Sequence, residues 1–401
     1  MATTYLAARI FDGDETTIED GFITIDDDKI SALGQQADLG SAASTAIDLG
    51  DATILPGLIN MHTHMTFSAD RDVLGNALND THEMKMVRAI ENLRRAIRSG
   101  VTTVRDCGAP NEVAFALRTA SANGLIEAPH VWAAGQVLTS TGGHCYYIGV
   151  EVDSVEDIKK AVRNQVKAGA DFIKVMATGG GLTPNTFPEN AQFSEQELVA
   201  LADDSRRLNR KIAAHCHGTP GIRHAIAAEV TTIEHCSFMT PSGVEYEEDA
   251  AEQVAEKGIF VCPTLSTGER ARQAAMEAGI ELPARWANMR ERRTDNLRRM
   301  ADLGVQFISG NDAGVTLTRF DDFQLDLEML VEYIGFSSEK AIATATSKAA
   351  DAIGTDEYGA LAAGKRADLL AVNGNALHDI GALRDIQLVI KAGEVVVDYR
   401  A

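Results

Sequence analysis

The chain has 401 residues, 45% of them hydrophobic and 24% charged, which is the composition of an ordinary globular protein. A formal net charge of −21 argues against nucleic-acid binding and against attachment to anionic membranes, because both require a basic surface. The length allows one large domain or two to three smaller ones.

The first residues and the cysteines favour a cytoplasmic location. The sequence opens with neither the basic region nor the apolar core of a signal peptide, and no apolar run approaches the roughly 20 residues of a membrane span. The five cysteines are odd in number and show no CxxC spacing, which favours free thiols in a reducing compartment. We therefore expect a soluble cytoplasmic protein.

The two ends of the chain have the pattern of short strands. Residues 1–55 and 357–401 alternate apolar and polar side chains between Gly and Asp turns, as small antiparallel sheets do. Because this pattern is confined to the two ends, we predict that they form the halves of one small β-sandwich domain. The remaining residues, 56–356, would then be a second domain inserted between the halves.

Residues 56–356 alternate apolar runs with amphipathic stretches. The apolar runs are 57–62, 101–106, 130–135, 171–176, 211–216, 231–235, 258–263 and 305–312. Helices are predicted at 82–99, 154–168, 194–208 and 322–333. Ser194 and Glu197 have the spacing of a capping box at the start of one of them. Eight runs in βα alternation favour an α/β fold, a (β/α)8 barrel of the TIM type, and a doubly wound sheet is the alternative.

Between the last two apolar runs lies a long insertion, residues 264–304. Its charged part, residues 285–300, is predicted to be a solvated helix face. The insertion could form a lid over the site or an interface between subunits, and the sequence does not decide between these two roles.

The first chemical signal is a pair of histidines at the end of the first run. His62 and His64 close the stretch LPGLINMHTH, and side chains two residues apart in a strand point to the same side. Two imidazole nitrogens directed at one point are suited to a metal ion. Core histidines with satisfied hydrogen bonds are the alternative interpretation.

Further polar residues lie in or at the ends of the other runs, where the active site of a (β/α)8 barrel forms. They are Lys174, His215, His235 and Asp312. His217 lies one step beyond the apolar run that ends at His215, so it is expected to face substrate or solvent. Glu234 should point to the face opposite His235 and serve a structural role.

Lys174 and Asp312 would each bring a different chemistry to such a site. Lys174 has apolar neighbours on both sides, and burying its ammonium group would be costly, which favours the neutral amine. A neutral amine can react with CO2 to give a carbamate that bridges two metal ions, whereas a lysine paired with a buried acid is the alternative. Asp312 could bind a metal and accept a proton from metal-bound water, and its alternative role is a helix N-cap.

Taken together and in this order, the motifs LPGLINMHTH, FIKVMATGG, AHCHG, IEHC and SGNDAG resemble the amidohydrolase superfamily. The glycine-rich stretches ATGGGLTPNT and TGGH are similar to those of the branch with Xaa-Pro and Xaa-Arg dipeptidases, ochratoxin-type amidases and phenylurea hydrolases. The resemblance covers nearly the whole chain.

This resemblance implies two divalent metal ions, zinc in the first place with manganese or cobalt as alternatives. His62 and His64 would hold the more buried ion, His215 and His235 the more exposed one, and N-carboxylated Lys174 would bridge them. A metal-activated hydroxide would attack the carbonyl of an amide, and Asp312 would ligate the buried metal and transfer the proton to the leaving amine. Relatives of this kind are commonly homo-oligomers.

The substrate follows less directly from the resemblance. The resemblance places His144 beside the substrate. Tyr147 could stack on an aromatic group of the substrate. Between them, Cys145 replaces the small residue that is expected at this position from the family pattern. The leading hypothesis is hydrolysis of a dipeptide or an N-acyl amino acid. Hydrolysis of a carbamate, urea or lactone is the alternative, and a mononuclear deaminase or a scaffold without activity is less favoured.

Overall fold

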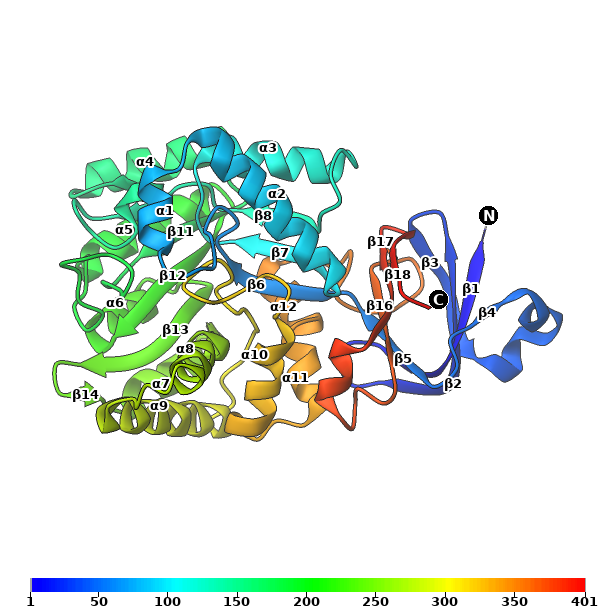
Figure 1. Ribbon diagram of the computed structural model, residues 1–401. Coiled ribbons are helices and arrows are strands. Elements are labelled where there is room, and N and C mark those ends of the chain that lie inside the picture. The colour runs from blue at the N-terminus through cyan, green and yellow to red at the C-terminus, as the bar shows by residue number, and fades with distance from the viewer. Residues whose placement is uncertain (1, 401) are drawn as a thin grey trace.

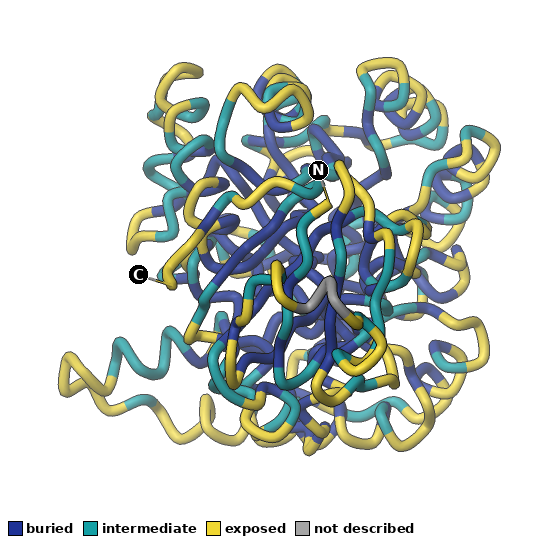
Figure 2. Tube along the Cα trace, turned by 90° about the vertical axis from the view of Figure 1, so that its right-hand side faces the viewer, coloured by how far each residue is buried: buried dark blue, intermediate teal, exposed yellow. Residues whose placement is uncertain are grey.

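The computed structural model describes residues 2–400, without the side chains of residues 41–43. Figure 1 shows two parts, a larger one in which helices surround strands and a smaller one built from both ends of the chain. Buried segments run through the middle of the molecule, and the exposed ones lie on its outer helices and loops (Figure 2).

The smaller part is a composite sheet to which both chain ends contribute strands. Its strands are β1 (Thr3–Phe11), β2 (Thr17–Asp26), β3 (Lys29–Gln35), β4 (Ile47–Asp48), β5 (Ala52–Pro56), β16 (Leu369–Asn373), β17 (Ile386–Lys391) and β18 (Glu394–Asp398). Their order is β18-β17-β16-β5-β1-β2-β3, with β4 beside β1. A 3-10 helix, η1 (Gln36–Thr45), follows β3, and another, η4 (Ile380–Arg384), precedes β17.

The predicted β-sandwich is not confirmed, because β5 joins the two ends into one sheet. Ile54 of β5 pairs with Ile10 of β1 on one side and with Ala371 of β16 on the other. A second sheet packed against this one is not found within residues 2–400. Its buried core includes the side chains of Ile10, Ile23 and Ile54. The domain boundaries at 55 and 357 stay a prediction.

The larger part contains seven parallel strands that agree with predicted apolar runs. They are β6 (Leu58–Thr63), β7 (Val101–Asp106), β8 (His130–Ala133), β11 (Phe172–Met176), β12 (Lys211–Gly218), β13 (Thr232–Thr240) and β15 (Phe260–Cys262). Hydrogen bonds join them in the sets β6-β7-β8 and β11-β12-β13-β15. The amide of Asp171, just before β11, donates to the carbonyl of Ala133 and so connects the sets. Short strands β9 (Val137–Thr139), β10 (Gly149–Glu151) and β14 (Gly243–Val244) lie at the margin.

The eighth run, 305–312, is not a regular strand but occupies the place of one. Phe307 bridges Val261 of β15, and Ala313 bridges Thr63 of β6, both in parallel orientation. The segment therefore connects the last strand to the first, which a doubly wound open sheet would not do. The result is a barrel-like α/β arrangement whose strands end at one common rim.

Gly310 explains why this segment can pass so close to β6. A Cβ atom at this position would lie 2.5 Å from the backbone nitrogen of His62 and 2.9 Å from Sγ of Cys262. Only a residue without a side chain fits between the two strands. The glycine of the SGNDAG motif thus sets the distance between Asp312 and the first pair of histidines.

Helices follow the barrel strands and cover them from outside (Figure 1). They are α1 (Val73–Asn79), α2 (His82–Arg98), α3 (Asn111–Ala122), α4 (Val155–Ala168), α5 (Glu195–Arg207), α6 (Thr219–Ala227), α7 (Glu248–Glu256), α8 (Leu265–Glu277), α9 (Ala284–Asp302), α10 (Gln324–Met329), α11 (Ser338–Thr344) and α12 (Ser347–Ile353). The capping box of Ser194 and Glu197 is confirmed at the start of α5. The predicted helix 322–333 starts at Gln324 and ends in a π-helical turn, η3 (Leu330–Ile334).

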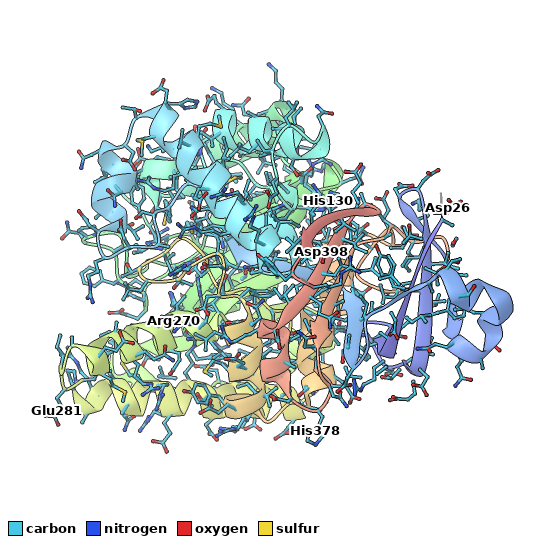
Figure 3. The ribbon with its side chains drawn as sticks, turned by 45° about the vertical axis from the view of Figure 1, so that its right-hand side comes forward. Asp26, His130, Arg270, Glu281, His378 and Asp398 are labelled. Carbon is cyan, nitrogen blue, oxygen red and sulfur yellow. The ribbon has the colours of Figure 1, made fainter. Side chains whose placement is uncertain are left out.

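The insertion 264–304 consists of the two helices α8 and α9. Glu281, in their connection, lies at the outer tip of this pair (Figure 3). One face of α9 is solvated as predicted, but Thr294, Leu297 and Met300 are buried. Within residues 2–400, no helix combines the length and the apolar composition that crossing a bilayer requires.

Candidate active site

The structure brings the predicted residues of the first strand and the last segment together. His62 and His64 are buried at the end of β6, and the Nε2 atom of each lies 3.4 Å from Oδ1 of Asp312. This Oδ1 atom is itself buried and has no hydrogen-bond donor in the described part of the chain. An acceptor oxygen without a donor, facing two imidazole nitrogens, fits a shared metal ion.

Lys174 lies in the same space. Its side chain is only 1% exposed, and its Nζ atom is 3.5 Å from Nε2 of His62. Among residues 2–400 it forms no ion pair with a carboxylate, so the alternative of direct neutralisation by a buried acid is not supported. A buried lysine amine next to a histidine nitrogen is consistent with a modified, metal-bridging side chain.

The second predicted pair meets a few ångströms away. Nε2 of His235 lies 3.0 Å from Nδ1 of His215. The other ring nitrogens have fixed acceptors: Nε2 of His215 lies 3.1 Å from the carbonyl of Gly179, and Nδ1 of His235 lies 2.7 Å from Oγ1 of Thr264. Donation to these oxygens leaves the two facing nitrogens as acceptors, which is the arrangement of metal-binding histidines.

Burial keeps these imidazoles neutral. It lowers the pKa of His64, His215 and His235 well below the ordinary value. A ligand nitrogen must be unprotonated, so these three histidines are in the form that binds metal. Conversely, burial raises the pKa of the nearby Cys107 thiol to about 11, which argues against a thiolate ligand.

Two candidate ligands are held in left-handed backbone conformations. His235 has φ 70° and Asp312 has φ 57°. Such conformations are costly for residues other than glycine and are concentrated at functional sites. At His235 the unusual φ also interrupts the alternation of side chains along β13. The consecutive residues Glu234 and His235 therefore both face the interior of the barrel.

Glu234 is the site residue that the sequence analysis placed wrongly. It was expected to face away from the histidines, but its Oε2 atom lies 3.0 Å from Nδ1 of His62, and its Oε1 atom accepts a hydrogen bond of 2.6 Å from Arg105. Burial is the largest single effect and opposes its ionisation, but Arg105, Lys174 and His62 together outweigh it, and the pKa of Glu234 lies well below its usual range. A carboxylate on Nδ1 orients the imidazole and leaves Nε2 to the metal.

Replacing Glu234 by glutamine should weaken the metal site and the fold together. We expect zinc affinity to fall about 10- to 100-fold, because His62 loses the carboxylate that orients it. We expect the free energy of unfolding to fall by about 3 to 5 kcal/mol, because Arg105 becomes an uncompensated buried charge. Competition with a chelator and urea unfolding measure the two effects.

The matched control for this variant is Glu229→Gln, which breaks the exposed ion pair with Lys257. It should leave zinc affinity unchanged. Wild-type zinc affinity in the Glu234→Gln protein would show that the contact with His62 has no role in the site.

The three residues predicted to contact substrate lie around this centre. The His144 ring is 4.6 Å from that of His215, and burial lowers its pKa to about 3. The His217 ring stacks on His235 at 4.4 Å, so a role as a further metal ligand is also open to it. Tyr147 lies 6.1 Å from the ring of Phe67, which stacks on His64.

With the geometry established, the family follows from sequence comparison. The model of the amidohydrolase family matches residues 53–396, a span that includes every residue of the centre. The chain belongs to this family. Amidohydrolases generally use metal ions, and the His, Asp and Glu groups of this chain fit that requirement.

Three relatives of this amidohydrolase support the assignment. The ochratoxinase of Aspergillus niger is 29% identical, and the match covers 96% of this chain and 84% of that protein. The structure of a Xaa-Pro dipeptidase with bound methionine in the active site has a TM-score of 0.87 at 30% identity, covering 98% of this chain and 99% of the other. A prolidase complexed with N-methylphosphonate-L-proline has a TM-score of 0.84 at 27% identity and the same coverage. This amidohydrolase is a hydrolase that acts on C–N bonds, on a TIM-barrel-like α/β fold.

Proposed function

We propose that this amidohydrolase uses two divalent metal ions to hydrolyse the amide bond of a dipeptide or an N-acyl amino acid. The observation that supports it best is the buried Oδ1 atom of Asp312, which faces two imidazole nitrogens without a donor. His62, His64 and Asp312 would hold one ion, and His215 and His235 the other. Zinc is the expected metal, because imidazole and carboxylate ligands suit it.

Lys174 would complete the centre as a carbamate formed with CO2. The unmodified amine already lies beside His62 and forms no ion pair with a carboxylate among residues 2–400. The neutral amine would react with CO2 and release one proton, which leaves an anionic carbamate. An anion between two cations is favourable where an ammonium group is not.

Hydrolysis of an amide needs a strong nucleophile and protonation of a poor leaving group. When bound, the two metal ions would polarise the substrate carbonyl and lower the pKa of water. Asp312 would accept the proton of the attacking water and pass it to the departing nitrogen. Burial raises the pKa of Asp312, which makes its carboxyl group a better proton carrier near neutral pH than an exposed aspartate.

The substrate class is supported by what two relatives bind. Methionine occupies the active site of the Xaa-Pro dipeptidase, and N-methylphosphonate-L-proline is the ligand of the prolidase. Both ligands contain an amino acid with a free carboxylate. We further propose a cytoplasmic, homo-oligomeric enzyme. Free and buried thiols at Cys107, Cys145, Cys216, Cys236 and Cys262 support the location.

A hydrolysis screen on zinc-loaded protein tests the proposed function. Dipeptides and N-acyl amino acids should be cleaved, with release of a free amino acid followed by mass spectrometry. Cleavage of carbamates, ureas or lactones without any amide cleavage would instead favour the alternative substrate class. Release of ammonia from an amino-substituted ring would favour a deaminase.

A further inference from the structure

Two buried asparagine side chains tie the segment that carries Asp312 to β6. Nδ2 of Asn60 donates to Oδ1 of Asn311 at 2.7 Å, and both side chains are buried. Nδ2 of Asn311 donates in turn to the carbonyl of Arg319 at 3.1 Å. The pair therefore links the first barrel strand to the segment 305–312 and to the loop that follows this segment.

The remaining polar atom of Asn60 is shared by the two sides of the site. Its Oδ1 atom accepts from the backbone amide of His62 at 3.2 Å and from that of Asn311 at 3.3 Å. Because two backbone N–H groups point at this atom, it is an oxygen, and the orientations of both side-chain amides follow. One side chain thus binds the amide of a candidate metal ligand and the amide of the residue before Asp312.

Asp312 is also held on its other side. The amide of Ala313 donates to the carbonyl of His62 at 3.2 Å, and the carbonyl of Ala313 accepts from the amide of His64 at 2.8 Å. Both neighbours of Asp312 in the chain are therefore bound to β6, whereas Asp312 itself has a left-handed φ of 57°. Such a conformation persists only where the surrounding structure enforces it.

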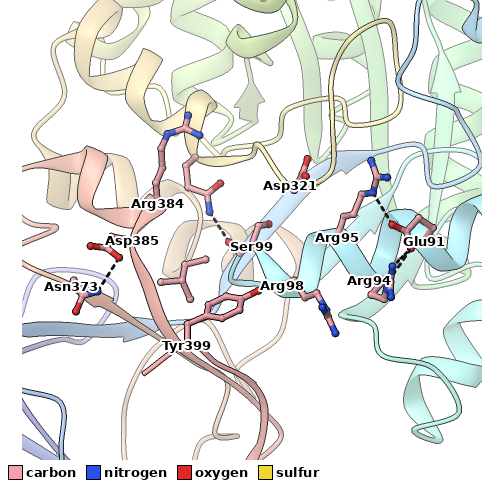
Figure 4. Close-up of a pocket in the computed structure, with 12 residues that line it drawn as sticks. Glu91, Arg94, Arg95, Arg98, Ser99, Asp321, Asn373, Arg384, Asp385 and Tyr399 are labelled. Carbon is pink, nitrogen blue, oxygen red and sulfur yellow. Dashed lines mark hydrogen bonds and ion pairs between the residues drawn. The ribbon is translucent and has the colours of Figure 1, made fainter. Parts of the chain in front are cut away.

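A buried side-chain amide joins distant segments in a second place, which allows a comparison. In a cleft of about 580 Å³ between α2 and the composite sheet (Figure 4), Nε2 of Gln324 donates to the carbonyl of Ser99 at 2.6 Å. Gln324 is as deeply buried as the asparagine pair. The described residues that line this cleft are all different from those of the candidate active site. Gln324 is therefore a reference for an amide that supports the fold alone.

We propose that Asn60 and Asn311 are positioning residues for Asp312. Their buried amide pair holds the aspartate in its left-handed conformation, with the carboxylate against the imidazoles of His62 and His64. An amide suits this role because it offers a donor and an acceptor without charge, whereas a carboxylate would bring a second negative charge into the buried site. This inference rests on the proposed function, in which Asp312 binds a metal ion and transfers a proton.

A double-mutant cycle tests whether the pair acts through Asp312. In the wild-type background, Asn311→Ala should lower both kcat on an alkyl amide and zinc affinity about 10- to 100-fold, the range for residues that orient a metal ligand. In the Asp312→Asn background, the same substitution should change both quantities less than about threefold, because the carboxylate that the pair positions is already absent. Competition with a chelator measures the zinc affinity.

Two further variants accompany the cycle. Asn60→Asp keeps the side-chain volume and an acceptor for the two backbone amides, but it loses the donor to Asn311. It should show the same dependence on Asp312, and it tests the pair if Asn311→Ala does not fold. Gln324→Ala is the matched control, which should lower the melting temperature and leave kcat and zinc affinity unchanged in both backgrounds.

An equal loss from Asn311→Ala in both backgrounds would overturn the proposal, since a purely structural role predicts that result. Wild-type kcat and zinc affinity in both Asn311→Ala and Asn60→Asp would overturn it as well. If the wild type hydrolyses no amide, the zinc affinities decide alone. A dependence on Asp312 would then support the positioning pair and contradict the proposed function, whereas independence of Asp312 would overturn the positioning pair.

Discussion

Replacing Lys174 by methionine is expected to reduce the metal content from about two ions per chain to one or fewer and to lower kcat/KM at least about a thousandfold. The reason is the position of Nζ beside His62, in the space between the two histidine pairs. Methionine fills the volume of the lysine stem, so that the change removes the bridging group without leaving a cavity. Metal analysis and the rate on the best substrate of the screen measure the result.

The control for this variant is Lys167→Met, on the exposed side of α4, which should retain metal and activity. Labelled bicarbonate provides a direct check, since a carbamate signal should appear in the wild type and in Lys167→Met only. Two metal ions in Lys174→Met would exclude the bridging role. One ion in both the variant and the wild type would favour a mononuclear site instead.

Replacing Asp312 by asparagine is expected to lower kcat by a factor of about 10² to 10⁴, the range of general acid–base catalysis. Asparagine retains an oxygen that can face His62 and His64, but it cannot carry a proton. The loss should be large for an alkyl amide and smaller for an anilide, because a better leaving group depends less on protonation. Steady-state rates on one substrate of each kind give the comparison.

Metal analysis of Asp312→Asn separates proton transfer from ligation. With two ions still bound, a slow rate reports the missing proton carrier, whereas loss of one ion reports the missing ligand. Asp321→Asn, which affects a carboxylate paired with Arg319, is the matched control and should leave the rate unchanged. Equal rates of Asp312→Asn and wild type on the alkyl amide would remove Asp312 from the mechanism.

Much of this site could be predicted because strand geometry is local. The pair His62 and His64 follows from a period of two residues, and the apolar neighbours of Lys174 indicate its burial. The common rim of a barrel then brings the strand ends together. Strand period and burial can both be inferred from the few residues on either side of a position.

The features of the site and barrel that could not be predicted depend on contacts between residues far apart in the sequence, which a local sequence pattern does not indicate. Glu234 faces the barrel interior together with Thr232, two residues earlier, and contacts His62 there. The left-handed φ of His235 brings the next side chain to the same side, and nothing in the stretch TTIEH indicates this. Arg293 belongs to a helix that reads as solvated, yet it turns one guanidinium group toward β13. The eighth run pairs with its neighbours only through isolated bridges, which its apolar residues alone do not reveal.

The pairing of β5 with β16 has a consequence for the order in which the newly made chain folds on the ribosome. β5 emerges early, whereas Leu369–Asn373, which covers one of its edges, emerges only after nearly all of the barrel. During this interval the edge of β5 is an open template for other chains. Synthesis that stops or slows before residue 369 therefore exposes the nascent protein to aggregation, however completely the catalytic barrel has formed.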